Sequence, residues 1–439
     1  MQLGHRRGSV DVTLLREDGS PLAHHDVIVE QTRHAFGFGN IGFELVPHAN
    51  GEDDRSDLAA AWLALFDTAT LPFYWGDFEP ERGHPDTARL LAAARWFAER
   101  GVRLKGHPLV WHTVKAPWLD PLPSDEVERL VRDRVTREVR DFAGLIDTWD
   151  AINEVAIMPV FTNEPDGVPN AVSRLARKLG RAGIIRLAFE TARAANPNAT
   201  LLINDSDLSA RYEHLIEDAL EAGIRIDAIG LQTHMHQGFR GEEQLWQIAE
   251  RFARFGLPLH FTEASLVSGD LMPPEIDDLN DYVVDAWPST PEGEERQADE
   301  LERLYRTLAA HPAVEAITYW GHHGSRILAG RADRPAPRRR QPQAVVRPAP
   351  RPDPGRVVAV PHPDAHRRRR AGAIGRLARP VPDRRGRDGG GRGDRPGDGA
   401  RDRAAVIRDP HAPSGCAAGH CADSDTLIRC RPQHFHRRC

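Results

Sequence analysis

Two glutamates, far apart in the chain, each follow a short apolar segment typical of a buried strand. Glu154 comes directly after residues 148–153 (TWDAIN), and Glu263 ends residues 259–263 (LHFTE). Asn153 precedes Glu154, so an amide and a carboxylic acid stand next to each other at the end of one expected strand. The amide can hold a sugar hydroxyl while the acid gives a proton to a glycosidic oxygen, and a second carboxylate completes the pair used in glycoside hydrolysis. An Asn–Glu pair alone is usually a plain turn; the second carboxylate favours sugar chemistry.

More polar and aromatic residues stand at the ends of other apolar segments. They are His107 and His112, Asn204 and Asp205, Gln232, His234 and His236, and Trp320. With the ends at Glu154 and Glu263 these make six, which are hard to explain as solvated turns, so the pattern favours one site at which strand ends meet. His234 and His236 could suggest zinc, but no third ligand follows at a fixed spacing, and we predict no metal and no cofactor.

Strand-like and helix-like segments alternate from residue 34 onward, as in parallel β/α units. The expected strands are 35–39, 68–75, 103–111, 148–153, 200–204, 228–233, 257–262 and 316–320, and the expected helices are 88–99, 124–142, 172–195, 211–222, 242–254 and 294–310. Eight such strands predict an α/β fold, the (β/α)8 TIM barrel, with the site at the carboxyl ends of the strands. A doubly wound open sheet is the alternative, but no glycine-rich loop follows the first strand.

The segment before the barrel alternates apolar and polar residues around a turn at residues 17–20 (EDGS), so we expect residues 9–34 to form a β-hairpin. No run of about eighteen apolar residues predicts a membrane span. The first eleven residues lack an apolar centre and do not read as a secretory signal. This predicts a cytoplasmic protein, or a secreted one if the true start lies upstream.

Composition divides the chain near residue 330. Residues 331–439 hold 26 Arg, 11 Asp and neither Lys nor Glu, a net charge of +15, whereas the rest carries −21 and the whole chain −6. All four cysteines lie in this second part. Residues 1–330 therefore need neither a disulfide nor a thiolate metal site.

Several motifs, in this order, resemble glycoside hydrolase family 10, the endo-β-1,4-xylanase family. The matching stretches are EPERG at 79–83, GHPLVWH at 106–112, WDAINE at 149–154, GLQTH at 230–234 and FTE at 261–263. The likeness covers residues 10–322. It implies a β-1,4-linked polysaccharide or oligosaccharide as the partner of a monomer, with no nucleic acid and no membrane.

The resemblance implies a role for each matching residue. Glu154 is similar to the family's general acid/base and Glu263 to its nucleophile, with His234 keeping Glu263 ionised. Asn153 would bind the 2-hydroxyl of the sugar at the cleaved bond. The residues expected to line the same subsite or form its apolar wall are His107, Trp111, Gln232 and Trp320.

The chemistry agrees with these roles on its own terms. Two carboxyl groups about 5–5.5 Å apart give double displacement with retention, through a covalent glycosyl-enzyme. Glu154 has to be protonated before attack, and we expect the neighbouring anionic Glu263 to raise its pKa. Once Glu263 is glycosylated that charge is gone, and Glu154 can act as a base toward water.

The sequence departs from the family at two places. After the second strand the family usually carries Glu–Asn and Lys, whereas residues 71–75 here are LPFYW. Stacking of a sugar on Tyr74 or Trp75 is the expected substitute, and xylan against another β-glycan stays open. After Glu263 the family often has Leu–Asp, where this chain has Ala264–Ser265.

The resemblance stops after Trp320–Gly321, where the sequence becomes rich in Arg, Pro and Gly. This tail is expected to be disordered: a flexible linker, an arm that binds nucleic acid through clustered Arg, or a wrong reading frame. Back-translating residues 322–329 (HHGSRILA) and dropping the first base allows Ile–Thr–Asp–Arg–Gly–Ser–Trp, which the resemblance would supply after the eighth strand. We therefore hypothesise a frameshift, natural or a sequencing error, near Gly321–His322.

The expected organisation is a hairpin extension at 1–33, a catalytic barrel at 34–322 and the tail at 323–439. Loss of the eighth helix predicts lowered stability and solubility. The main hypothesis is a retaining glycosidase that cleaves β-1,4 linkages in xylan or xylo-oligosaccharides. The alternatives are an inactive carbohydrate-binding remnant of the same fold and a nucleic-acid-binding protein that acts through its tail.

Overall fold

The computed structural model describes residues 3–8, 12–16, 18–22, 24, 27–162, 168–276, 282, 284 and 286–321, and the backbone of two strands at 405–408 and 428–432. The chain divides into two units, one of residues 1–8, 25–347 and 420–439, the other of residues 9–24 and 348–419. Residues 322–404 lie outside the described part. The disordered tail, the frameshift and the domain boundary at residue 322 therefore stay predictions.

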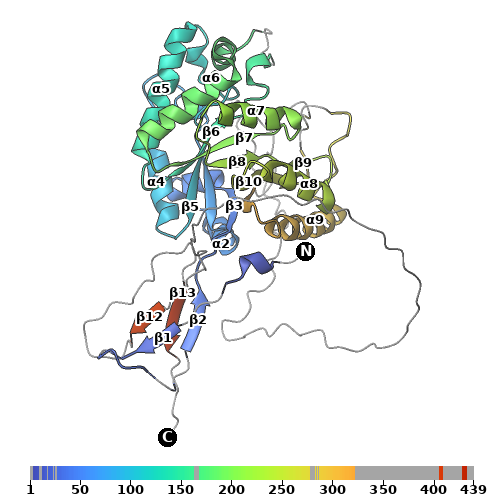
Figure 1. Cartoon of the computed structure of the whole chain (residues 1–439). Helices are drawn as coiled ribbons and strands as arrows, with labels where there is room; N and C mark the ends of the chain where they lie inside the picture. Colours follow the sequence, from blue (N-terminus) through green and yellow to red (C-terminus); the bar gives the residue numbers. More distant parts are fainter. Residues whose placement is uncertain are drawn as a thin grey trace, which may run out of the picture. The chain divides into compact units, whose positions relative to one another are not determined.

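Eight parallel strands close into a barrel in the first unit (Figure 1). In order around the barrel they are β3 (Gly37–Ile41), β4 (Thr68–Pro72), β5 (Arg103–His107), β6 (Thr148–Asn153), β7 (Thr200–Asp205), β8 (Ala228–Leu231), β10 (Leu259–Leu266) and β11 (Val314–Tyr319). Pairing of β11 with β3, with Ile317 opposite Phe38, closes the ring. This confirms the predicted (β/α)8 barrel and rules out the open sheet. The two-residue strand β9 (His234–Met235) pairs with the far end of β10.

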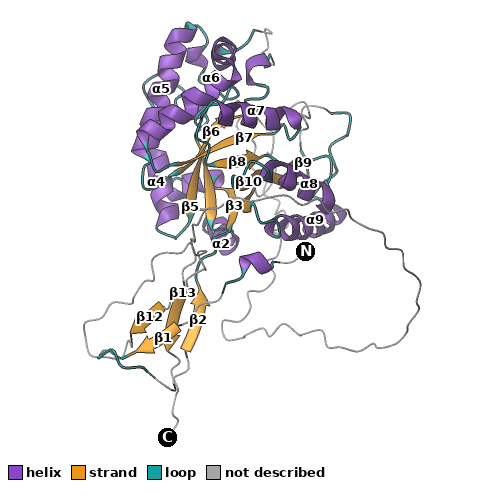
Figure 2. Cartoon of the chain, viewed as in Figure 1, coloured by secondary structure: helices purple, strands orange, loops and turns teal. Residues whose placement is uncertain are grey.

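Helices surround the barrel, as Figure 2 shows in purple around the orange strands. They are α1 (Val46–Ala49), α2 (Ser56–Leu65), α3 (Trp75–Phe78), α4 (Thr87–Ala98), α5 (Ser124–Asp141), α6 (Ala171–Ala195), α7 (Ala210–Glu221), α8 (Glu242–Ala253) and α9 (Pro291–Ala309), with short 3-10 helices at Gly4–Arg6, Phe43–Leu45, Pro117–Leu119 and Met158–Val160. Because helices cover the strands from outside, β6 and β8 are buried almost throughout. No described helix is both long and apolar enough to cross a membrane.

The hydrophobic core fills the layer between strands and helices and includes the fully buried Trp149, Tyr212 and Phe73. Trp149 shows how closely this layer is packed, because a Cβ added to Gly106 on β5 would lie 2.1 Å from its ring. Gly106 directly precedes His107, a predicted site residue. The packing of the core therefore fixes the strand from which that histidine emerges.

The predicted N-terminal hairpin is only partly present. The strands outside the barrel are β1 (Val12–Leu15), β2 (Val27–Gln31), β12 (Ala405–Arg408) and β13 (Ile428–Pro432). After β1 the chain turns back, and Leu15 faces Pro21 in an antiparallel bridge. This register would place Val27 opposite residue 9, beyond the start of β1. β1 instead pairs with β12, and β2 pairs with β13, so the expectation that the two arms pair along their length is wrong.

Candidate active site

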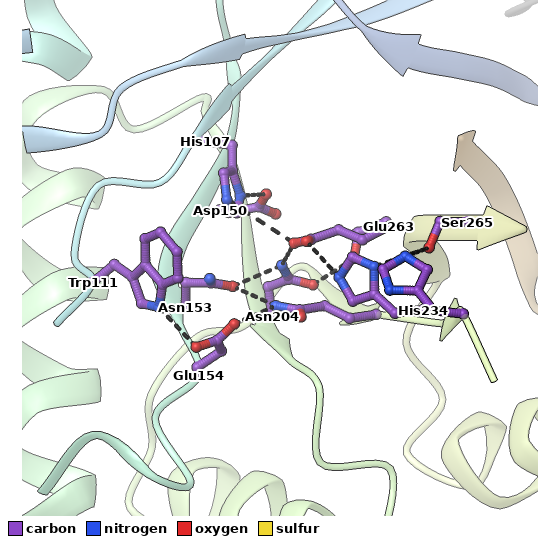
Figure 3. A network of polar contacts seen from close by, with 12 residues as sticks. His107, Trp111, Asp150, Asn153, Glu154, Asn204, His234, Glu263 and Ser265 are labelled. Atoms are coloured by element: carbon purple, nitrogen blue, oxygen red, sulfur yellow. Dashed lines mark hydrogen bonds and ion pairs between the residues drawn. The ribbon is translucent and has the colours of Figure 1, made fainter. Parts of the chain in front are cut away.

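The two predicted carboxylates lie at the same end of the barrel, and Figure 3 shows both within one network of polar contacts. Glu154 follows β6, and Glu263 lies within β10. The backbone of Glu154 has φ 54°, in the left-handed region that non-glycine residues seldom adopt. The N–H of Glu154 donates to the carbonyl of Asn204 at 2.8 Å, and Asp205 accepts the N–H of Ala156 at 2.9 Å. Strand β7 thus fixes the turn that presents the acid.

Asp205 is buried immediately beside this turn. Burial raises its pKa to about 7, although the carboxyl also accepts the N–H groups of Ala156 and Asp207, which lower it in part. The negative charge of Glu154 raises it further. A carboxyl that titrates near neutral pH therefore supports the backbone of Glu154.

Glu154 is held by side chains from two other strand ends. Nε1 of Trp111 donates to Oε2 of Glu154 at 2.9 Å, and Nε2 of Gln232 lies 3.4 Å from Oε1. Trp111 comes after β5 and Gln232 comes after β8. Both were expected in the site from the sequence, and the structure brings both to the same carboxyl group.

Two buried asparagines connect the carboxylates. Nδ2 of Asn204 donates to Oε1 of Glu263 at 2.9 Å and to Oδ1 of Asn153 at 2.8 Å, while Gln232 donates to the same Oδ1 at 2.9 Å. The hydroxyl of Thr262 donates to Oδ1 of Asn204 at 2.6 Å and so fixes the orientation of that amide. The path from Glu263 through Asn204, Asn153 and Gln232 ends at Glu154. Asn204 thereby orients both the nucleophile candidate and the amide beside the acid.

The structure surrounds Glu263 with groups that favour its charged form. Nε2 of His234 lies 3.2 Å from Oε2, and Nε2 of His107 lies 4.0 Å from Oε1. Burial acts to raise the pKa of Glu263, but the hydrogen bond from His234 and the positive charge of Lys105 act against it, and the pKa lies below its ordinary value. The sequence expectation that His234 bonds Glu263 thus matches the geometry.

His107 is positioned from within the barrel by a buried ion pair. Nδ1 of His107 lies 2.7 Å from Oδ2 of Asp150, and Nζ of Lys105 lies 2.8 Å from the same oxygen. Burial acts to raise the pKa of Asp150, but Lys105 and His107 lower it below its ordinary value. Sequence reasoning missed both residues of the pair. The available signal was a Lys and an Asp inside otherwise apolar strand segments, because charges are buried only when paired.

Aromatic rings form a wall beside the carboxylates. The rings of Tyr74, Trp111 and Trp320 each lie within 6.3 Å of the His107 ring, and Phe43 contacts both Tyr74 and Trp320. Burial raises the pKa of Tyr74 well above its ordinary value, and the charges of Glu263 and Glu154 add to the effect. Tyr74 and Trp320 therefore lie against His107, close to the carboxylates, while their contact with a sugar stays a prediction. Phe43 joins them from a 3-10 helix that carried no sequence signal.

Trp75 is placed elsewhere. It is buried in the core, its Nε1 donates to Glu79 at 3.1 Å, and it packs between Arg134 and Trp118. The prediction that Trp75 could stack on a sugar is corrected by this placement, because its ring is already covered. The first turn of α3 rotates Trp75 away from the site while Tyr74, the residue before the helix, faces it.

The zinc alternative finds no support in the donor set. Nε2 of His234 faces Glu263, while Nδ1 lies 3.1 Å from the hydroxyl of Ser265. Nε2 of His236 lies 2.9 Å from the same hydroxyl. In the described ranges no three His, Cys, Asp or Glu side chains cluster as metal ligands would. The two histidines instead join the hydrogen-bond network of Glu263.

Comparison with known proteins agrees with this geometry. The model of glycosyl hydrolase family 10 matches residues 68–327. An endo-1,4-beta-xylanase/feruloyl esterase of Xylanibacter ruminicola is 26% identical over 279 residues, which are 58% of this chain and 37% of that protein. Endo-1,4-beta-xylanase B of Thermotoga neapolitana is 26% identical over 255 residues, 56% of this chain and 66% of that protein.

Solved structures share the fold. The crystal structure of xylanase 10B from Thermotoga petrophila in complex with xylobiose superposes with a TM-score of 0.51 at 21% identity, covering 65% of this chain and 82% of that one. The chain spans little more than a third of the length of the first curated relatives that it matches. These likenesses fix the family and the barrel, and leave the reaction to be argued from the site.

Proposed function

The chain belongs to glycosyl hydrolase family 10, and from that premise we propose that it is an endo-1,4-β-xylanase-like glycosidase that retains the anomeric configuration. It cleaves β-1,4 linkages in xylan or xylo-oligosaccharides by double displacement. The observation that carries the proposal is the hydrogen-bond path from Glu154 to Glu263, at whose end Glu263 meets groups that lower its pKa. Two carboxyls with separated tasks are what this reaction requires.

In the first step Glu263 attacks the anomeric carbon, and the glycosidic C–O bond breaks. Glu154 gives its proton to the departing oxygen, so the leaving group departs as a neutral alcohol. Nε1–H of Trp111 donates to Oε2 of Glu154 and Nε2 of Gln232 lies against Oε1, so both oxygens of the acid are held in place. His234 and Asn204 hold the two oxygens of Glu263 in place for the attack.

In the second step water replaces Glu263 at the anomeric carbon. Glu154, now ionised, takes a proton from that water, and the ester bond to Glu263 breaks. The carboxylate that returns meets the same donors, His234 and Asn204, without any rearrangement of the protein. Two inversions at one carbon give net retention.

The remaining site residues bind the sugar in this proposal. Oδ1 of Asn153 accepts from Asn204 and Gln232, which turns its amide nitrogen toward the sugar as a donor to the 2-hydroxyl. The rings of Trp320, Trp111 and Tyr74 supply the apolar wall. A single chain contributes every one of these groups, which supports action as a monomer.

The substrate class rests on the names of the relatives and on the xylobiose found in the similar barrel. The test is hydrolysis of xylo-oligosaccharides by the full chain and by Glu154→Gln, Glu263→Gln and the surface control Glu302→Gln. Glu263→Gln should abolish turnover, and Glu154→Gln should lower kcat/KM by roughly 10²–10⁴-fold, less with an activated aryl leaving group that needs no proton. Full activity in both site variants would reject the assignment.

A catalytically impaired, carbohydrate-binding remnant is the second candidate. It is favoured by the end of the family match at residue 327, shortly after β11 (Val314–Tyr319), where an eighth helix would follow. This candidate predicts binding of xylo-oligosaccharides without turnover in the chain as it stands, and turnover once the frame near Gly321–His322 is restored. Calorimetric binding and product analysis on the two proteins separate the candidates.

A further inference from the structure

The hydroxyl of Ser265 lies between two imidazole rings. It is 3.1 Å from Nδ1 of His234 and 2.9 Å from Nε2 of His236, and His234 in turn reaches Glu263 through Nε2 at 3.2 Å (Figure 3). Ser265 is fully buried and His236 is 1% exposed. The register of β9 on β10, which pairs His234 with Ser265, creates this contact. The four side chains form one chain of hydrogen bonds that ends at the nucleophile candidate.

Counting hydrogens along this chain fixes its direction. An ionised Glu263 only accepts, so Nε2 of His234 carries a hydrogen and donates. In a neutral His234, Nδ1 is then an acceptor and takes the single hydrogen of the Ser265 hydroxyl. The Ser265 oxygen must in turn accept from Nε2–H of His236. Each donor points toward Glu263.

The far end of the chain agrees with this direction. Nδ1 of His236 is buried and meets no partner among the residues that the structure describes. If Nε2–H of His236 donates to Ser265, Nδ1 carries no hydrogen and is an acceptor without a donor. If His234 were a cation, Nδ1–H would donate to Ser265, Ser265 would donate to His236, and His236 would bury an unpaired N–H. Unpaired buried donors are rarer than under-satisfied acceptors, because a buried N–H without a partner loses the hydrogen bond that it makes with water in the unfolded chain.

We propose that Ser265 and His236 are positioning residues that keep His234 neutral, with its Nε2–H directed at Glu263. The assignment of Glu263 as nucleophile rests on the proposed function; the state of the two histidines does not. A neutral donor orients the carboxylate without neutralising its charge, so Glu263 stays a strong nucleophile in the first step. The same N–H contacts the ester oxygen once Glu263 is glycosylated.

Other ionisable groups around His234 have to be considered in any test that varies pH. Among the residues that the structure describes, those from the packed elements are Glu263 on β10, His236 after β9, Lys105 and His107 on β5, Asp150 on β6 and Glu154 after it. Burial lowers the pKa of His236 to about 3, which keeps that ring neutral across the working range. Observing His234 directly is therefore better than reading its state from activity alone.

The direct test is ¹⁵N NMR of the histidine rings in the full chain, with His234 and His236 assigned by substitution. The expected result is a neutral Nε2–H form of both rings from about pH 5.5 to pH 8. Ser265→Asp places a carboxylate against Nδ1, and His234 should then become doubly protonated at about pH 6. A doubly protonated or Nδ1–H form of His234 in the unmodified chain would overturn the proposal.

Kinetics supply a second readout. Ser265→Ala should lower kcat on an aryl xyloside about tenfold with KM changed less than about twofold, because orientation of the nucleophile is lost rather than binding. Ser265→Thr, which keeps the hydroxyl, should recover most of the rate. Ser173→Ala, at a fully buried serine on α6 outside the site, is the matched control and should match the unmodified chain. Equal kcat in Ser265→Ala and Ser173→Ala would count against a positioning role of Ser265.

The two readouts separate this proposal from the proposed function. If the chain hydrolyses no xyloside but its histidines show the neutral Nε2–H forms, the proposed reaction is wrong and the proposed role of Ser265 and His236 stands. If the chain is active and His234 is a cation, the proposed role of Ser265 and His236 is wrong and the proposed reaction stands.

Discussion

His234 is the residue whose removal most directly alters the charge state of Glu263. In His234→Asn, burial still raises the pKa of Glu263 while the hydrogen bond from His234 that lowers it is lost. The ionised carboxylate then requires a higher pH, so the acid limb of kcat/KM should move to higher pH, by about one unit. A pH profile on an activated aryl xyloside measures this, with the exposed His214→Asn as control; an unmoved acid limb would mean that His234 does not set the charge of Glu263.

Buried histidines give the protein an acid-dependent stability. Burial lowers the pKa of His112 to about 3, below the ordinary value that applies in the unfolded chain. The unfolded state therefore binds a proton first, and the stability from the neutral folded ring is complete above about pH 6.5 and is lost as pH falls. When the pH falls from 7 to 5, the free energy of unfolding should decrease by about 2 kcal/mol less in His112→Phe than in the unmodified chain. Urea unfolding at both pH values measures this difference.

Asp205 should change stability with pH in the opposite direction to His112, and so provides a check on that argument. Its pKa is raised to about 7, so the folded carboxyl keeps its proton while the unfolded one ionises from about pH 4 upward. Stability from Asp205 therefore falls as pH rises through this window. Asp205→Asn should flatten that fall between pH 5 and pH 7. A fall as steep as in the unmodified chain would show that Asp205 is ionised throughout.

Among single residues, the sequence pointed more clearly to the groups proposed to touch a substrate than to the groups that hold those side chains in place. Glu154, Glu263, Asn153 and Gln232 end apolar segments, and strand ends of a barrel meet at one face. Lys105 was not predictable in its role, because its pairing with Asp150 depends on two neighbouring strands in three dimensions. Trp75 was misplaced for a related reason: an alternating pattern does not show where a short helix turns a ring inward.

Among the elements, helix α5 does more than cover the barrel. Arg134 on this helix is 3% exposed, bonds the buried Glu138 at 3.0 Å and donates to the carbonyls of Phe73 and Leu109 in the segments that follow β4 and β5. These are the segments that carry Tyr74 and Trp111 into the site. An element on the outside of the barrel thus positions two of its aromatic side chains.

Removing the Arg134 side chain should lower the stability of the protein considerably. Arg134→Met leaves Glu138 and the carbonyl groups without their main donor, and we expect a loss of about 3–5 kcal/mol in the free energy of unfolding. Arg129→Met on the same helix is the matched control, because Arg129 forms an exposed pair with Asp133 and its loss should cost less than about 0.5 kcal/mol. Equal losses in urea unfolding would show that Arg134 is no anchor.

The sequence predicted the order and type of the helices and strands better than the residues at which they begin and end. The strands expected at 68–75 and 103–111 stop at Pro72 and His107. Both were drawn too long because most residues directly beyond them are also apolar and buried, and Arg134 instead bonds the carbonyl groups of Phe73 and Leu109 there. The predicted hairpin is only partly present because β1 and β2 pair with β12 and β13, which come from the far end of the chain, and a local pattern cannot reveal such pairing.

For the whole molecule, the open question is the eighth β/α unit. Phe38 on β3 packs on Tyr305 of α9 at 6.2 Å, at the seam where β11 meets β3. A helix after β11 would be expected to cover this seam, and we propose that the frame change removed it from residues 322 onward. A frame-restored chain should then unfold at a temperature several degrees higher than the chain as it stands. Equal melting temperatures, or an unbroken reading frame on resequencing, would remove the idea.

The central claim is that Glu263 forms a covalent bond to the sugar while Glu154 serves as acid and base. The most direct measurement is mass spectrometry of the full chain after incubation with an activated 2-deoxy-2-fluoro-β-xyloside, which slows release of the glycosyl-enzyme. We expect one added sugar per chain, mapped to the peptide that contains Glu263, and no label in Glu263→Gln. A label on another residue, or turnover that gives the inverted anomer with no label at all, would contradict the account.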